Sequence, residues 1–251
     1  MQITHFIFSA AVVAAAAMVA TGRTISDGAT AAATGHNSLS KEEKTEGWEL
    51  LFNGENSAGW RGVKKASFPK KGWEIHDGIL TLRAKSGAGD IVTTKTYSSF
   101  ELQLEFRLTP HANSGVKYFI QTDTDKNPGI GPEFQLYDDK RPNARNDGTN
   151  YYEIGSLYNL IPASKDKPVL GAGVWRKARI VVRGVEVEHW LDGVKTVSYN
   201  RRSPEFRALV AKTKFKNVAN YGEWASGHIL LQDHGNEVSF RSIKIRALRH
   251  P

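Results

Sequence analysis

The segment Glu133-Phe-Gln-Leu-Tyr-Asp138 contains side chains that can transfer protons or hydrogen-bond a ligand. In a strand, side chains alternate between two faces, so Glu133 and Gln135 share one face while Phe134 and Leu136 share the other. Asp138 reaches the polar face only if a bulge shifts the register, as bulges beside active sites often do. A solvated outer strand face explains the same alternation, so this segment alone leaves both interpretations open.

A second polar group lies near the C-terminus, in the run Gly227-His-Ile-Leu-Leu-Gln-Asp-His-Gly235. Strand alternation gives Gln232 and His234 one orientation and turns Asp233 the other way. Histidine titrates near neutral pH and can act as base, acid or metal ligand, whereas glutamine only donates and accepts hydrogen bonds. Taken alone, the pattern favours a structural histidine that closes a turn.

A third group begins at Asn113-Ser-Gly115, which leads into another expected strand. Alternation places Lys117 and Phe119 on one face of this strand and Val116, Tyr118 and Ile120 on the other face. The ammonium of Lys117 can orient a carbonyl or hydroxyl oxygen if its face is the concave one. A turn by itself also accounts for the Asn-Ser-Gly sequence.

Composition excludes several functional classes. The 251 residues contain no cysteine, so disulfides, thiolate metal sites and a cysteine nucleophile are absent. The chain has no Gly-x-Ser-x-Gly elbow, phosphate-binding P-loop, His-Glu-x-x-His or dinucleotide fingerprint. The net charge is +8, yet zinc-finger spacings, aromatic RNA-binding motifs and arginine-rich helices are lacking, so we expect no nucleic-acid partner.

The elements that must position these groups are mostly strands. Residues Phe100–Leu108 alternate strictly between apolar and polar, and many short runs of the same kind follow. Asp77-Gly78 and Asp192-Gly193 each join two such runs, which predicts two tight hairpins. Only Ser203–Ala211 has a helical period. The sequence therefore predicts an all-β antiparallel sandwich or barrel with few short helices.

The N-terminal region has a different composition. Residues 1–22 lack charged side chains and contain the apolar run Phe6–Ala20, which predicts a cleaved signal peptide and export to the periplasm or the medium. The run is too short for a comfortable membrane span, so we expect none in the mature protein. Residues 23–44 have the composition of a flexible linker. Residues 45–250 are expected to form one domain, in which the basic cluster Arg201–Lys216 is interpreted as a solvated insertion, with a lid or an envelope-facing patch as the alternative.

Several ordered segments together resemble the 3-keto-disaccharide hydrolase family, also described as 3-keto-glucoside 1,2-lyase/3-keto-2-hydroxy-glucal hydratase domains. The resemblance spans about Gly47 to Leu248. It is carried by Gly47-Trp-Glu-Leu-Leu-Phe-Asn-Gly54, Trp73-Glu-Ile-His-Asp-Gly-Ile-Leu80, Asn113-Ser-Gly115, Glu133-Phe-Gln-Leu-Tyr-Asp138, Gly155-Ser-Leu-Tyr158 and Ile229-Leu-Leu-Gln-Asp-His-Gly235. It implies a concanavalin A-like jelly roll, an all-β sandwich of two antiparallel sheets. The family usually has an arginine near Phe119, and we expect Lys117 to replace it.

The resemblance also implies a chemistry, because a ketone at C3 of a sugar acidifies the proton on C2 and permits elimination of the glycosidic oxygen. Water then adds to the resulting glucal. Such a route needs a base, a group that stabilises the enolate, and an acid. We expect the base to be His234 or Glu133, the polar contacts to be Gln232, Gln135 and Lys117, and further substrate contacts to come from Tyr158 and Asn113. Asp138 is expected to orient the histidine or to help hold a divalent cation.

Two other functions fit the same fold. A β-glucanase of the laminarinase type needs two carboxylates about 5 Å apart, but an amide stands at Gln135 where such a strand carries an acid. A non-catalytic module would bind sugars on its polar face. Most large aromatics are expected in the core, but one or two on that face would form a stacking platform for sugar rings, and the candidates are Tyr151, Tyr152, Tyr158, Trp60, Trp175, Trp190 and Trp224. The discriminating observation is geometric: the site assignment requires one concave pocket that contains Glu133, Gln135, Lys117, Gln232 and His234, and it fails if they scatter over both faces.

Overall fold

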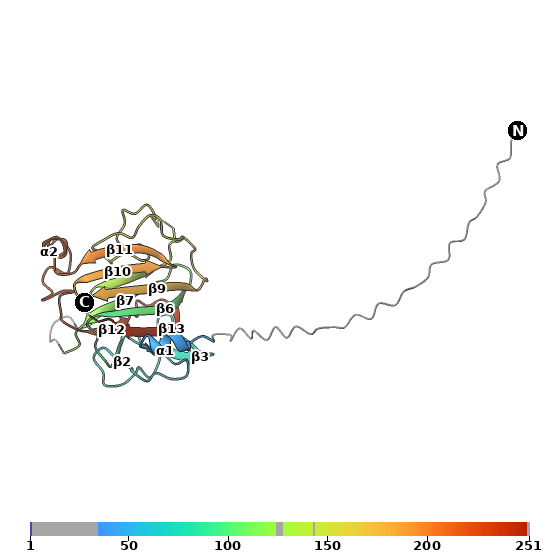
Figure 1. Cartoon of the computed structure of the whole chain (residues 1–251), viewed down its shortest axis with the longest axis horizontal. Helices are drawn as coiled ribbons and strands as arrows, with labels where there is room; N and C mark the ends of the chain where they lie inside the picture. The colour runs from blue at the N-terminus through green and yellow to red at the C-terminus, as the bar shows by residue number, and fades with distance from the viewer. Residues whose placement is uncertain (2–34, 124–127, 143, 250–251) are drawn as a thin grey trace, which may run out of the picture. The chain divides into compact units, whose positions relative to one another are not determined.

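The computed structural model describes Met1 and residues 35–123, 128–142 and 144–249. The predicted signal peptide and residues 23–34 of the predicted linker therefore lie outside the described residues, apart from Met1. Two antiparallel sheets and two short helices make up the described part, which confirms the predicted sandwich (Figure 1).

The larger sheet has eight strands. In spatial order these are β11 (Val194–Asn200), β10 (Glu186–Leu191), β9 (Arg176–Arg183), β6 (Phe100–Leu108), β13 (Val238–Ala247), β4 (Ile79–Leu82) and β3 (Trp73–His76), with β1 (Trp48–Leu50) also paired to β13. The smaller sheet has the order β2 (Trp60–Gly62), β5 (Ile91–Thr93), β12 (His228–Leu231), β7 (Asn113–Ile120) and β8 (Glu133–Tyr137). Segments distant in sequence thus become neighbours, and β12 lies beside β7.

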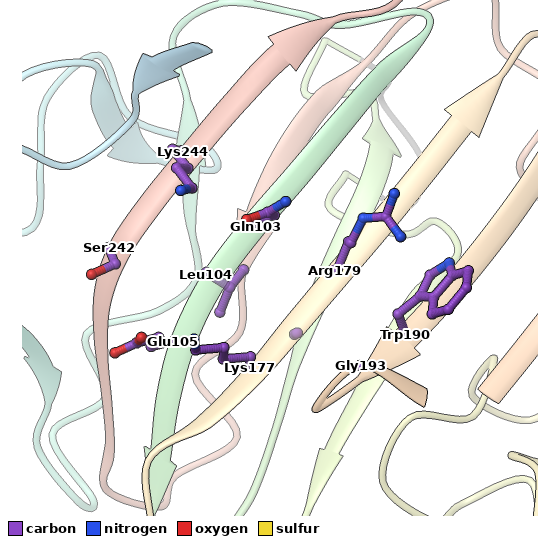
Figure 2. A pocket seen from close by; sticks show the side chains of 10 residues that line it. Gln103, Leu104, Glu105, Lys177, Arg179, Trp190, Gly193, Ser242 and Lys244 are labelled. Carbon is purple, nitrogen blue, oxygen red and sulfur yellow. The ribbon is translucent and has the colours of Figure 1, made fainter. Parts of the chain in front are cut away.

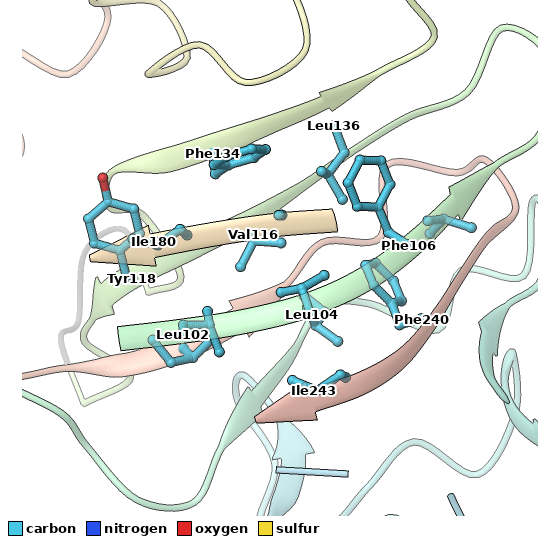
Figure 3. Close-up of a cluster of buried hydrophobic side chains, with 14 of the residues drawn as sticks. Leu102, Leu104, Phe106, Val116, Tyr118, Phe134, Leu136, Ile180, Phe240 and Ile243 are labelled. Atoms are coloured by element: carbon cyan, nitrogen blue, oxygen red, sulfur yellow. The ribbon is translucent and has the colours of Figure 1, made fainter. Parts of the chain in front are cut away.

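The core lies between the two sheets, where alternate residues of facing strands meet (Figure 3). From the larger sheet these include Leu102, Leu104, Phe106, Ile180, Phe240 and Ile243, and from the smaller sheet Val116, Tyr118, Phe134 and Leu136. Burying one such side chain contributes roughly 1.5–3 kcal/mol. Their burial fixes the register of β7 and β8, because slipping either strand by one residue would exchange its two faces.

Both predicted hairpins are present. Asp77 and Gly78 have φ of 50° and 73°, and Asp192 and Gly193 have φ of 49° and 86°, as a two-residue turn with left-handed backbone requires. The predicted helical segment is also present as α2 (Pro204–Ala211), which begins after Ser203, whose hydroxyl accepts from the Phe206 N–H. Neither α2 nor any other helix among the described residues is long and apolar enough to cross a membrane.

The predicted flexible linker is corrected for residues 35–44, which fold onto the domain. Asn37 donates to the Gly78 carbonyl at 2.8 Å and accepts from the Ser242 N–H at 2.8 Å. Helix α1 (Lys41–Thr45) follows, with a reciprocal capping box between Ser40 and Glu43. The segment has few apolar residues, and for that reason its composition indicated a linker. Specific hydrogen bonds, and not apolar burial, hold it on the domain.

Candidate active site

A pocket of about 350 Å³ opens on the face of the five-stranded sheet that points away from the inter-sheet core. Most of the residues singled out in the sequence line it, namely Asn113, Lys117, Glu133, Gln135, Tyr158, Gln232 and His234. They come from β7, from β8, from a connection after β8 and from the segment that follows β12. The geometry thus brings together groups that are far apart along the chain.

Glu133 reaches the pocket because its neighbours along β8 face the core, and because the strand opposite has no side chain at Gly115. A Cβ atom at position 115 would lie 2.7 Å from the Glu133 Cδ and 2.8 Å from its Cγ. Real Cβ atoms do not approach other atoms so closely. The Glu133 side chain therefore lies across the glycine, which is part of β7 rather than of a turn.

Glu133 is only 5% exposed, and this burial raises the pKa of its carboxyl to about 7. The ammonium of Lys117 opposes the effect, since its Nζ lies 3.8 Å from Glu133 Oε2, and Lys214 opposes it from further away. The carboxylate of Asp90 acts in the same direction as burial. A carboxyl with such a pKa can accept and return a proton near neutral pH, as a general base must.

Three amide oxygens in the pocket lack hydrogen-bond partners. Asn113 Oδ1, Gln135 Oε1 and Gln232 Oε1 are buried, and no group of the described residues donates to them. The position of Gln232 is fixed through its backbone, because Ser114 Oγ donates to its carbonyl at 2.8 Å and its N–H donates to the Gly115 carbonyl at 3.0 Å. Buried polar atoms are normally paired, so these acceptors suit a ligand rich in hydroxyl groups.

Tyr158 stands beside Glu133 because its segment pairs with β8. The Tyr158 N–H donates to the Glu133 carbonyl at 3.1 Å, and the Gln135 N–H donates to the Ser156 carbonyl at 3.2 Å. Lys214 Nζ donates to the Tyr158 hydroxyl oxygen at 2.9 Å. Because an ammonium only donates, the hydrogen of the Tyr158 hydroxyl is left to donate to a ligand oxygen.

Two residues near the site were not predicted. Lys214 belongs to the basic cluster 201–216, and that cluster was the only signal for it, since sequence alone does not show which surface the segment covers. Asp90 follows a glycine-rich turn and accepts from the Asp233 N–H at 2.8 Å, while Asp233 accepts from the Gly89 N–H at 2.9 Å. Burial raises the pKa of Asp90, against the effect of Lys117. The two loops thereby hold the chain just before His234, which is exposed at the rim of the pocket.

Asp138 does not enter the pocket. Its carboxylate accepts from the backbone N–H of His111 at 2.8 Å and from that of Lys140 at 3.1 Å, so it stabilises turns at the end of β8. The bulge needed to bring it to the polar face is missing, because β7 and β8 keep one register from Lys117↔Glu133 to Asn113↔Tyr137. The expected roles of orienting His234 or holding a cation are therefore corrected.

The residues present do not favour a metal site. Among residues 35–123, 128–142 and 144–249, no three His, Cys, Asp or Glu side chains gather in a way that could hold a metal ion.

Phe119 also departs from the expected alternation. Its φ of 55° turns the chain, so Phe119 packs in the main core against Tyr118 and Phe100, while Ile120 moves to the opposite face beside Leu230. Gly227 permits the close approach, since a Cβ there would clash with the Phe119 backbone atoms. With Phe119 in the core, Lys117 is the cationic side chain that β7 contributes to the pocket.

A second pocket, of about 310 Å³, lies on the outer face of the larger sheet (Figure 2). Its most prominent side chain is Trp190, which lies between two cations: the Arg179 guanidinium is 5.0 Å from the ring and the Lys195 ammonium is 5.6 Å away. Arg179 in turn pairs with Glu101 at 2.5 Å. These groups satisfy one another, so we interpret this face as structural.

Comparison with known proteins agrees with this geometry. Residues 47–246 match the model of a family described as a 3-keto-alpha-glucoside-1,2-lyase-like domain. A 3-keto-disaccharide hydrolase of Bacteroides thetaiotaomicron is 30% identical over a match that covers 84% of this chain and 82% of the relative.

Two solved structures are also similar. Both are proteins of Parabacteroides distasonis assigned provisionally as glycosyl hydrolases. One is 31% identical with a TM-score of 0.75 and covers 86% of this chain and all of its own length. The other is 26% identical with a TM-score of 0.62 and covers 80% of this chain and 99% of its own. With a sandwich of this kind and a match over most of its length, the chain belongs to the 3-keto-alpha-glucoside-1,2-lyase-like family and is a carbohydrate-active hydrolase or lyase.

Proposed function

We propose that the protein cleaves the glycosidic bond of 3-keto-glycosides, including 3-keto-disaccharides, by removing the C2 proton, eliminating the C1 substituent and adding water. One observation carries the proposal. The pocket is lined by Glu133, a buried carboxyl with a pKa of about 7, and by the amide side chains of Asn113, Gln135 and Gln232, whose buried oxygens have no partner among the described residues. The first is suited to removing a weakly acidic proton, and the second to holding a sugar by its hydroxyl groups.

The reaction balances without a cofactor. Glu133 takes the C2 proton, and the electrons of the C–H bond form the enolate, whose negative charge lies on the oxygen at C3. The enolate then expels the glycosidic oxygen from C1, and that oxygen takes up a proton as it leaves. Water adds to the resulting 2-hydroxy-glucal, with hydroxide bonding to C1 and a proton returning to C2. The net change is hydrolysis.

Each step has a candidate residue. Lys117, with its Nζ 3.8 Å from Glu133 Oε2, is positioned to stabilise the enolate oxygen. Tyr158 has a hydroxyl hydrogen free to donate and is assigned to the leaving oxygen. His234, exposed at the rim, is the second candidate base and is assigned to the incoming water.

The test is to incubate the purified protein with a 3-keto-glucoside and with its unoxidised parent, following release of the leaving group. We expect cleavage of the keto sugar only. Glu133→Gln should abolish this activity, and Tyr158→Phe, which removes only the hydroxyl, should lower kcat by about 10²-fold or more. Cleavage of the parent alone, or of neither compound, would contradict the proposal.

The alternatives have less support. A retaining β-glucanase needs two carboxylates about 5 Å apart, and the second carboxylate of the strand motif, Asp138, is bonded to backbone outside the pocket. A non-catalytic binding module would account for the amide oxygens, but it gives no proton-transfer role to the buried Glu133 carboxyl in the same pocket. It would be favoured if His234→Ala weakened sugar binding in a protein that never cleaved a keto sugar.

We further propose that the protein is exported to the periplasm or the medium. Support comes from the uncharged N-terminal residues 1–22 and the apolar run Phe6–Ala20 within them. Cell fractionation followed by N-terminal sequencing tests this. A full-length chain retained in the cytoplasm would contradict it.

A further inference from the structure

A strip of tyrosines extends from the pocket to the surface. Tyr158 lines the pocket, the ring of Tyr152 lies 5.5 Å from it between centroids, and the ring of Tyr151 lies 4.8 Å from that of Tyr152. Tyr151 and Tyr152 are 39% and 42% exposed, and they belong to the few large apolar side chains that the described residues leave at the surface. We call these three residues the tyrosine strip.

The strip is held in place rather than loosely exposed. Tyr152 Oη donates to Asn159 Oδ1 at 2.9 Å, and the Tyr152 N–H donates to Asn150 Oδ1 at 2.9 Å. The Tyr151 carbonyl accepts from the Asn159 N–H and from Ser156 Oγ, both at 3.0 Å. An aromatic side chain that is already fixed offers contact area at a small further entropy cost, which is how tyrosine serves in binding surfaces.

The position of the strip indicates which part of a substrate it would meet. The pocket, at about 350 Å³, is near the lower end of the range for small-ligand sites and suits one sugar ring. Tyr158 is the residue assigned to the leaving oxygen, and Tyr152 is the next ring of the strip outside the pocket. We propose that Tyr151 and Tyr152 form a subsite for the leaving group and select leaving groups that carry a ring, such as a second sugar or an aromatic alcohol. This inference rests on the proposed function.

The experiment compares two substrates that differ only in the leaving group. Methyl and benzyl 3-keto-glucosides of the same anomeric configuration release alcohols of similar acidity, but only the benzyl compound carries a ring. Relative to the parent protein, we expect Tyr151→Ala/Tyr152→Ala to lower kcat/KM for the benzyl compound about tenfold, a change that corresponds to about 1.4 kcal/mol. The value for the methyl compound should stay within about twofold. A 3-keto-disaccharide should behave like the benzyl compound.

Two further variants separate the causes. Tyr152→Phe keeps the ring and should retain most of the preference for the benzyl compound. Leu170→Ala removes a side chain that is 44% exposed on the same connection between β8 and β9 but lies outside the strip, and it should change neither substrate. Thermal unfolding confirms that each variant folds.

The outcomes are distinct. If the double variant changes both substrates equally, or neither, the subsite is refuted while the proposed function stands. If the parent protein cleaves neither keto-glucoside, the proposed function fails, and the subsite fails with it.

Discussion

The raised pKa of Glu133 has a cost for stability that can be measured without any substrate. In the unfolded chain this carboxyl titrates near its ordinary pKa of 4.5, whereas in the folded protein burial moves the pKa to about 7. Between these values the folded protein keeps a proton that the unfolded chain has released. Folding is therefore favoured by this group at low pH, and the benefit disappears as the pH rises through 7.

The size of the effect follows from the two pKa values. Each pH unit between them corresponds to 1.36 kcal/mol, so ionising Glu133 in the folded state costs about 3 kcal/mol above pH 8 relative to pH 4. Glu133→Gln has nearly the same shape and cannot ionise. The free energy of unfolding of this variant minus that of the parent should therefore increase by about 3 kcal/mol between pH 4 and pH 8.5.

Urea unfolding at half-unit pH steps measures this difference for the parent and the variant together. Gln135→Asn serves as the control, because it alters the same face of β8 without removing a titrating group, and its difference from the parent should not change with pH. A Glu133→Gln difference that varies by less than 1 kcal/mol, or that decreases with pH, would refute the assignment of a raised pKa to this carboxyl.

Three further predictions concern activity and packing. If Glu133 is the base, kcat/KM for a 3-keto-glycoside should rise with pH through about 7, and a profile that is flat from pH 5 to 9 would argue for another base. The Gly115→Ala variant should lose most of its activity and about 1–3 kcal/mol of its unfolding free energy, because the new Cβ would meet the Glu133 side chain. Full activity of this variant in the assay would mean that Glu133 is placed differently. Asp138→Ala should lower the unfolding free energy by about 1–3 kcal/mol, because it leaves the N–H groups of His111 and Lys140 unpaired. It should leave kcat/KM unchanged at temperatures where the variant is folded. A large loss of kcat would show that Asp138 acts in the site.

The features that were predictable from sequence are governed by near neighbours. The Asp77-Gly78 hairpin follows from the left-handed backbone that these two residue types tolerate. The shared face of Glu133 and Gln135 follows from strand alternation. The family resemblance strengthened the functional interpretation of Tyr158 and Gln232, whose polar side chains carry little signal alone.

The features that were missed depend on contacts across the fold. Phe119 breaks the alternation of β7 because its backbone turns to positive φ against Gly227, more than a hundred positions later. Lys214 reaches Tyr158 only because the segment after α2 returns over the smaller sheet. The side chain of Asn37 binds the backbone of Gly78 and Ser242, although the segment around it has the composition of a linker. No local sequence pattern indicates such long-range contacts.

The residue at the position of Gly115 is expected to distinguish active relatives of this chain from inactive ones. A glutamate at the position of Glu133 can persist in a copy that has lost its chemistry, since a polar residue on a strand face is tolerated for many reasons. The space that this glutamate needs is a stricter requirement, because any side chain at the position of Gly115 would displace it. A relative that keeps the acid but has a larger residue at the position of Gly115 is expected to be an inactive copy or to have acquired a different task, and one that keeps both residues is the better candidate for an assay.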